Sequence, residues 1–217
     1  MTLTLGRIAA TALLLPLALG VATAGCGSDH QHHATSTGSA TATSPRAVDQ
    51  AFVRQMIPHH QQAVEMAEIA GAHAEHDEIK RLARAIISTQ RKEIAKLSAI
   101  GQAIGAGESS DMAGDAATLG LAMNQMGMSM DMSTLADADR FDQAFIDDMT
   151  VHHAGAVAMA KAQLRGGADA RLSAIATAIV DAQQAEIEEM ANWRADWYGT
   201  AADDAAGTAG TMHEMTH

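Results

Sequence analysis

The chain has 217 residues, of which 47% are hydrophobic and 3% aromatic, and its formal net charge is −12 with histidine neutral. This acidic balance argues against the basic patches that bind nucleic acid, so we expect no nucleic-acid partner, and it suits the binding of cations. The single cysteine permits no internal disulfide, so a packed core or bound ligands must stabilise the fold.

Residues 1–25 have the features of a signal peptide. Arg7 is followed by an apolar run over 8–21, which is too short for a membrane-spanning helix. Small residues directly precede Cys26, and this pattern predicts a lipoprotein whose lipidated first mature residue is Cys26. The alternative is an ordinary secretory signal with an incidental cysteine. The mature protein is therefore expected outside the cytoplasm, anchored to the outer face of the cell membrane, or secreted or periplasmic without the lipid.

Residues 26–44 are rich in Thr, Ser, Ala and Gly, and they include His30, His32 and His33. Such a segment cannot bury apolar surface, so we expect a flexible tether. Ser44 and Pro45 then supply a helix N-cap and a first helical residue. We expect one helix over residues 45–70 and a second over 77–100, forming a first module of residues 45–101.

A linker rich in Gly, Ser and Met covers residues 102–135, and we expect it to lack regular structure. The second module covers residues 136–198, with helices expected over 137–165 and 169–198. Residues 199–217 form a low-complexity tail that ends in methionines and histidines, and we expect this tail to be flexible.

The two modules are copies of one unit. Residues 49–67 and 142–160, offset by 93 positions, are identical at eleven of nineteen places. The same offset maps Gln90 onto Gln183 and Glu93 onto Glu186. Two repeated helical hairpins predict an all-α fold, a four-helix bundle with approximate two-fold symmetry.

Histidine pairs occupy the core-facing positions of both copies. Phe52, Met56 and His59 share a heptad-like stripe, and His60 belongs to the neighbouring stripe. The second and fourth helices place a Gln and a Glu on their own apolar stripes. The resulting set of repeated polar and sulfur-bearing positions comprises Met56, His59, His60, Glu93, Met149, His152, His153 and Glu186.

This repeated set has two interpretations. In the first, the glutamates accept hydrogen bonds from the imidazoles and merely satisfy buried polar groups. In the second, the set binds a metal ion, because imidazole suits Cu, Zn, Fe or Ni and thioether selects Cu(I). Adjacent histidines with a methionine one turn earlier, present twice, favour the metal, and a carboxylate behind a ligand histidine is compatible with both interpretations.

The linker provides a second indication of soft-metal binding. Five methionines lie within ten residues and alternate with Gly, Ser and Asp, which is not a helix core pattern: Met123, Met126, Met128, Met130 and Met132. One interpretation is an oily loop that packs over the bundle. Clustered thioethers suit capture of Cu(I) better. His73 and His76 lie outside the repeated unit, and we expect them to be solvated.

The duplicated Met-x-x-His-His motif and the secretory leader resemble the domain of unknown function 305 family of secreted bacterial proteins, over roughly residues 45–198. The resemblance implies a ferritin-like four-helix bundle, and some members are associated with copper or silver. The Glu-x-x-His pattern of ferritin-like di-iron centres is absent from the two histidine helices.

These observations favour an extracytoplasmic lipoprotein that binds metal ions. Copper is preferred over other transition metals, with Cu(I) favoured and Cu(II) included. Its role would be to sequester copper or hand it on, in metal tolerance or homeostasis. Two alternatives stay open. The first is a ferritin-like metal-dependent oxidoreductase. The second is a structural or interaction lipoprotein without metal.

Overall fold

The computed structural model describes residues 43–129 and 131–199. The leader, Cys26, the histidines of the tether, Met130 and the tail from residue 200 lie outside these ranges, so the predictions about them stay predictions. Within the described ranges, no helix combines the length and apolar character needed to cross a membrane.

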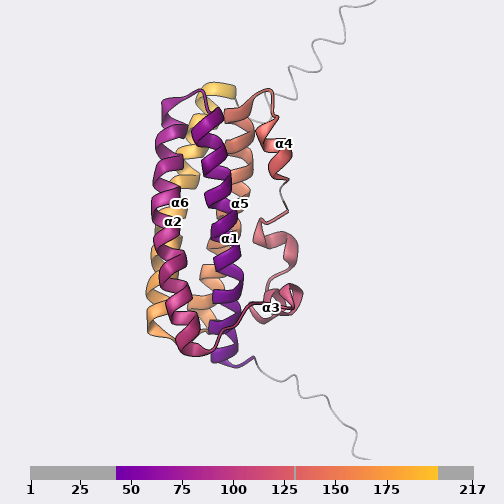
Figure 1. The fold of residues 1–217 in the computed structure, drawn as a ribbon, viewed down its shortest axis with the longest axis vertical. Helices are drawn as coiled ribbons and strands as arrows, with labels where there is room; N and C mark the ends of the chain where they lie inside the picture. The colour runs from indigo at the N-terminus through magenta and orange to yellow at the C-terminus, as the bar shows by residue number, and fades with distance from the viewer. Residues whose placement is uncertain (1–42, 130, 200–217) are drawn as a thin grey trace, which may run out of the picture. The chain divides into compact units, whose positions relative to one another are not determined.

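Four long helices form the bundle: α1 (Pro45–His73), α2 (Asp77–Ile104), α5 (Phe141–Gly166) and α6 (Ala170–Tyr198). Helix α1 packs along α2, α5 packs along α6, and α1 also packs along α5 (Figure 1). A smaller contact between α2 and α6 closes the remaining side. No strand occurs among the described residues, so the predicted all-α fold of two helical hairpins is confirmed.

The helix ends follow from local hydrogen bonds and glycine. Ser44 Oγ accepts the backbone N–H of Ala47 at 3.2 Å and caps α1, as its position before a proline predicted. Helix α2 ends at Gly105, whose φ of 68° is the left-handed conformation that closes a helix. Both α1 and α2 continue beyond their predicted ends at residues 70 and 100. Gly101 lies inside α2 and does not end it. A Cβ at this position would lie 2.8 Å from the Val53 side chain, so glycine permits α2 to pack closely against α1.

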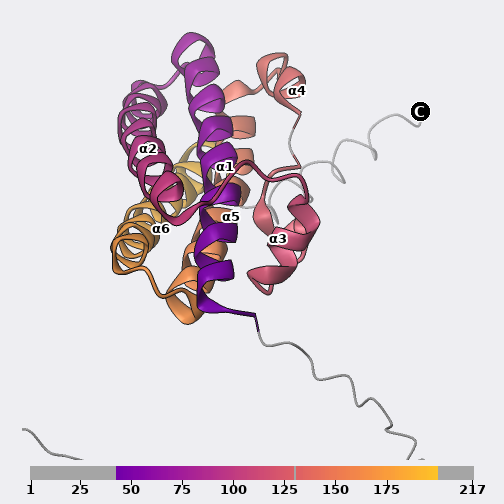
Figure 2. The same ribbon diagram turned by 60° about the horizontal axis from the view of Figure 1, so that its bottom comes forward.

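The linker is not the structureless segment that its composition predicted. It contains α3 (Met112–Thr118), the 3₁₀ helix η1 (Met123–Met126) and α4 (Met132–Ala136). Helix α3 packs on α1, η1 packs on α5, and α4 touches both, so the linker lies over the α1–α5 side of the bundle (Figures 1 and 2). The prediction failed because burial of a few separated apolar residues, such as Leu119 and Leu135, leaves no periodic signal.

One buried carboxylate attaches the linker to α1. Asp115 is 6% exposed and accepts hydrogen bonds from two nitrogens of Arg54, with Nε 2.9 Å from Oδ2 and Nη2 donating to Oδ1. Ser109 Oγ donates to the same carboxylate at 2.6 Å. Bidentate pairs of this kind are among the stronger polar contacts, because charge and planar geometry match. The first half of the linker is therefore fixed in place on the outer surface of α1.

The core has two apolar halves with a polar layer between them. One half gathers Phe52 and Met56 of α1 with Ala156 and Met159 of α5. The other gathers Met66 of α1 with residues of α5 such as Phe145 and Met149. The antiparallel order of α1 and α5 places the histidine pairs of both helices between these halves.

Each hairpin supplies a carboxylate that binds the turn of the other. Asp49 of α1 accepts the backbone N–H of Ala168 at 3.0 Å and of Asp169 at 3.1 Å, just before α6. Asp142 of α5 accepts the backbone N–H of Glu75 at 3.0 Å and of His76 at 2.7 Å, just before α2. Asp49 and Asp142 are repeat equivalents, so this exchange of caps follows the two-fold symmetry of the bundle.

The prediction of solvation holds only in part for His76, whose side chain is 35% exposed. Its Nδ1 lies 2.6 Å from Asp142 Oδ2, and its ring stacks on Trp197 with centroids 3.8 Å apart and planes 6° apart. His73 is exposed as expected, although its ring stacks on Phe141 at 5.5 Å. Sequence position near a turn suggested solvation for both, whereas the partners of His76 come from distant helices.

Candidate metal centre

The four repeated histidines form a layer across the bundle. His59 and His60 of α1 and His152 and His153 of α5 are all 0% exposed. The rings of His59 and His152 are in close contact, with centroids 3.7 Å apart and planes tilted by 38°. Within each pair the centroids are 6.3 and 6.4 Å apart, so the outer histidines point away from this central contact. The prediction that all four face the interior is confirmed.

The linker fixes the protonation of one inner histidine. His59 Nε2 lies 2.9 Å from the backbone carbonyl oxygen of Met126. Because a carbonyl can only accept, the hydrogen must reside on Nε2 and the lone pair of the neutral ring must reside on Nδ1. That Nδ1 atom is buried and has no hydrogen-bond partner among the described residues. His59 therefore presents an unshared nitrogen lone pair inside the core.

His152 has even fewer partners. Both of its ring nitrogens are buried without a hydrogen bond to any described residue. Burial, followed by the neighbouring His153 and His60, lowers the pKa of His152 to about 3. Burial, followed by His152 and the other two histidines, also places the pKa of His59 well below the ordinary 6.5. Both inner rings are consequently neutral near pH 7 and able to donate a lone pair to an ion.

The outer histidines contact the repeated glutamates. His153 Nε2 donates to Glu186 Oε2 at 2.8 Å. His60 Nε2 lies 2.9 Å from Glu93 Oε2, a contact of similar length that lacks the alignment of a hydrogen bond. The His–Glu contacts predicted from the sequence are therefore present. A carboxylate that contacts one nitrogen of an imidazole can also orient the ring so that its other nitrogen binds an ion. This geometry is compatible both with a structural hydrogen-bond network and with a metal site.

The methionines of the repeat flank the layer. Met56 and Met149 are both 0% exposed, and they belong to opposite apolar halves of the core. In residues 43–129 and 131–199, no three His, Cys, Asp or Glu side chains lie close enough together to hold one ion. The centre thus presents two inner imidazoles, with thioethers in the adjacent core on either side, rather than a carboxylate-rich cage.

The linker methionines do not form one group. Met126 is fully buried, Met123 is 44% exposed, and Met128 and Met132 are partly buried. Met132 packs against the same core half as Met149. Their roles as ligands stay predictions. Burial of Met126 against the core agrees with the alternative that this loop packs over the bundle.

Two glycines let the linker reach the histidine layer. A Cβ on Gly155 would lie 2.1 Å from the carbonyl oxygen of Met126, and a Cβ on Gly127 would lie 2.6 Å from that of Val151. Gly127 also has a φ of 68°, which disfavours other residues. The first module has Gln62 at the position of Gly155, so this glycine breaks the repeat where the linker touches α5. Sequence comparison of the two copies exposes the difference, but only the structure gives its reason.

We expect Gly155→Ala to lower the free energy of unfolding by about 1–3 kcal/mol, the usual cost of inserting a methyl group where there is no space. Chemical denaturation measures this change. Gly71→Ala is the matched control, because no atom lies within 4 Å of the added Cβ. An alanine in a helix should then stabilise slightly. Equal effects of the two substitutions would contradict the close approach of linker and α5.

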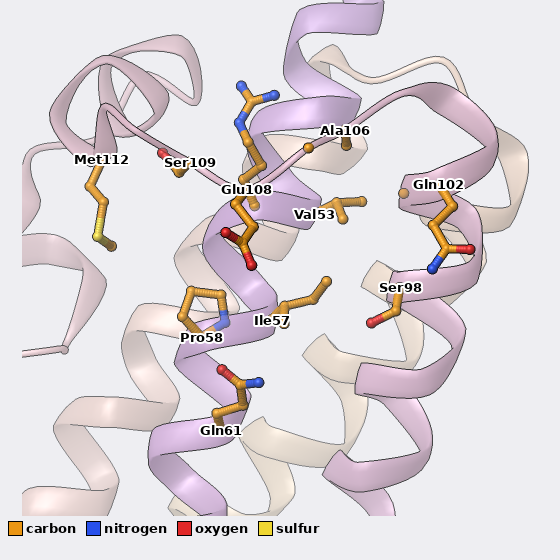
Figure 3. A pocket seen from close by; sticks show the side chains of 13 residues that line it. Val53, Ile57, Pro58, Gln61, Ser98, Gln102, Ala106, Glu108, Ser109 and Met112 are labelled. Carbon is orange, nitrogen blue, oxygen red and sulfur yellow. The ribbon is translucent and has the colours of Figure 1, made fainter.

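The large surface cavity lies elsewhere. About 600 Å³ is enclosed between α1, the end of α2 and the start of the linker (Figure 3). Val53, Ile57 and Pro58 form part of its wall, with Ser98 and Gln102 opposite. None of the eight repeated candidates lines it. The predicted ligands are therefore a feature of the core, not of this cavity.

A family model described as a domain of unknown function, DUF305, matches residues 49–216. The chain belongs to the DUF305 family. The resemblance noted from the Met-x-x-His-His motif is thereby confirmed, and the match covers both modules and the linker between them. No curated protein matches the chain.

Solved DUF305-type structures share this fold. The Cu(I)-bound form of CopM is 35% identical, with a TM-score of 0.59 over 70% of this chain and 98% of CopM. A DUF305 protein of Streptomyces coelicolor is 29% identical, with a TM-score of 0.64 over 70% of this chain and 95% of its own. A DUF305 fragment from Deinococcus radiodurans is 26% identical, with a TM-score of 0.57 over 69% and 95%. CopM has also been solved with Ag and with Cu(II).

Proposed function

We propose that this DUF305 protein binds copper outside the cytoplasm, with the inner histidines as the tighter site. The observation that carries the proposal is His152, a buried neutral imidazole with neither nitrogen partnered among the described residues. Its ring lies against that of His59, whose Nδ1 is also unpartnered there. Leaving a buried polar atom unpaired costs about 1–3 kcal/mol. A bound ion would remove that cost, whereas a purely structural network would be expected to pair these atoms.

The donor set favours copper among metals. Imidazole nitrogens suit copper, and the thioethers of Met56 and Met149 in the adjacent core select its reduced form, Cu(I). The Cu(I), Cu(II) and Ag complexes of CopM support this choice, because that protein shares the fold at 35% identity. Glu93 and Glu186 would orient the outer histidines His60 and His153.

The linker methionines would serve as a second, weaker set of Cu(I) ligands. Met123 is exposed, and Met128 and Met132 are partly buried, so an arriving ion could meet these thioethers before the core. Met126, fully buried with its carbonyl oxygen on His59, would act on the core site, and Met130 belongs to the same proposal from the sequence alone. Capture on the surface followed by transfer inwards suits a role in sequestering copper or handing it on.

Lipid attachment at Cys26 would keep this activity at the membrane surface. The signal-like leader supports export, and the related Streptomyces coelicolor protein is itself predicted to be secreted. Binding at the outer face of the cell membrane would place the ligands where metal ions enter, which agrees with a function in tolerance or homeostasis.

Titration of the mature protein with Cu(I), followed by thermal unfolding, tests the proposal. We expect copper to raise the stability of the wild type by about 2.7 kcal/mol at a hundred times the dissociation constant. His152→Leu should abolish that gain, because it removes the ligand while it leaves the metal-free fold intact. Met123→Leu with Met128→Leu should lower only the number of weakly bound ions.

His73→Leu is the control, since this histidine is exposed and lies outside the histidine layer. If copper leaves the wild-type unfolding midpoint unchanged, or if His152→Leu binds as tightly as the wild type, the core site is wrong. In that event the histidines and glutamates act as a scaffold, and Glu93→Gln should destabilise the protein irrespective of copper.

A further inference from the structure

A second polar cluster lies between α2 and α6, on the opposite side of the bundle from the linker. It surrounds a small cavity of about 10 Å³. The lining is mixed, with apolar residues at its ends and four repeated polar residues between them: Ile86, Thr89, Gln90, Glu93, Ile179, Ala182, Gln183 and Glu186. A cavity of this volume holds a single water molecule or a single ion.

The two glutamines point to a ligand in this cavity. Gln90 and Gln183 are each 3% exposed, and the Oε1 atom of each is buried without a hydrogen-bond partner among the described residues. A buried amide oxygen without a partner is unfavourable by about 1–3 kcal/mol. The two glutamines are repeat equivalents, so a buried oxygen without a hydrogen-bond partner occurs on the α2 wall and on the α6 wall of the same cavity.

The two glutamates add charge to the same space. Their Oε2 atoms contact the outer histidines, His60 at 2.9 Å and His153 at 2.8 Å. This leaves Oε1 of each carboxylate without that contact. These carboxylates are only 12% and 20% exposed, and one imidazole contact each leaves them poorly compensated for the loss of water. The cavity wall thus offers amide and carboxylate oxygens and an excess of negative charge.

We propose that this cavity binds one hard divalent cation, of the class of Ca²⁺ or Mn²⁺, through oxygen atoms of Gln90, Glu93, Gln183 and Glu186. Carboxylate and amide oxygens are the ligands such ions prefer. Two carboxylates balance the charge of one divalent ion. The site differs in chemistry from the imidazole and thioether layer beneath it, and it does not depend on the copper proposal.

Mn²⁺ is a suitable probe because the electron paramagnetic resonance signal of the free ion reports its binding. We expect the full mature chain to bind one Mn²⁺ that Ca²⁺ displaces. The double variant Gln90→Leu, Gln183→Leu should weaken this binding at least tenfold and keep its fold, because it removes unpartnered oxygens and retains similar apolar volume. Thr89→Val is the matched control on the same wall, and His152→Leu should bind Mn²⁺ as the wild type does.

Three results would overturn the proposal. One is the absence of saturable Mn²⁺ binding up to millimolar concentration, which would mean that the cavity holds water only. Another is equal binding by the wild type and the glutamine double variant, which would assign the ion to surface carboxylates. The third is a loss of Mn²⁺ affinity in His152→Leu equal to that in the double variant, which would mean that Mn²⁺ occupies the histidine layer.

Discussion

Lowering the pH from 7 to 3 should destabilise the metal-free protein, and His152 alone should account for on the order of 4 kcal/mol. The unfolded chain binds a proton at His152 near pH 6.5, whereas burial holds the pKa of the folded state at about 3. Between these two values the unfolded state binds more protons, so stability falls as the pH falls. The lowered pKa of His59 acts in the same direction over the same range.

The measurement is denaturant-induced unfolding of chelator-treated protein at a series of pH values. His152→Leu should reduce the slope between pH 6.5 and 3, because leucine binds no proton in either state, and the contribution of His59 should remain. His73→Leu is the matched control, since His73 is exposed and lies outside the histidine layer. A wild type and a His152→Leu variant with parallel pH dependence would show that His152 is not held neutral in the folded state.

Asp142→Ala should lower the free energy of unfolding by at least about 2 kcal/mol, because two backbone N–H groups lose their acceptor and each such loss costs about 1–3 kcal/mol. Asp142 is 2% exposed and accepts hydrogen bonds from two backbone N–H groups before α2, and its Oδ2 contacts the ring of His76. The substitution leaves these donors without an acceptor. Chemical denaturation measures the loss, and the α1–α2 turn should also exchange its amide hydrogens faster.

Asp49→Ala tests the symmetric position, where Gln163 and two backbone N–H groups lose their acceptor. We expect a loss of similar size. Glu78→Ala is the control, because its pair with Arg81 is exposed and screened by water and should contribute little to stability. If Asp142→Ala destabilises no more than Glu78→Ala, the exchanged caps do not stabilise the fold.

The parts of this fold that the sequence predicted are those with a repeated or periodic pattern. Identical spacing in two copies identified the hairpins, and the heptad stripe of α1 was sufficient to place His59 in the core. The contacts of His60 and His153 with Glu93 and Glu186 were also predicted, because facing stripes of neighbouring helices must meet.

The parts that were missed depend on contacts between distant segments. Asp142 sits on a helix face beside apolar residues, and only the packing of α5 against the α1–α2 turn makes it a cap for a remote helix. The carbonyl of Met126 reaches His59 because Gly155 has no side chain. Neither relation has a fixed spacing along the chain, so periodicity cannot reveal it.

The exchange of Asp49 and Asp142 between hairpins also bears on how a duplicated chain of this kind could arise. A single hairpin contains both the carboxylate and the turn that needs one, but it does not bring them together. Two identical hairpins related by a two-fold axis satisfy each other through a self-complementary interface, as in a symmetric homodimer. Joining two such hairpins in one chain would keep this complementary interface and make its formation independent of protein concentration.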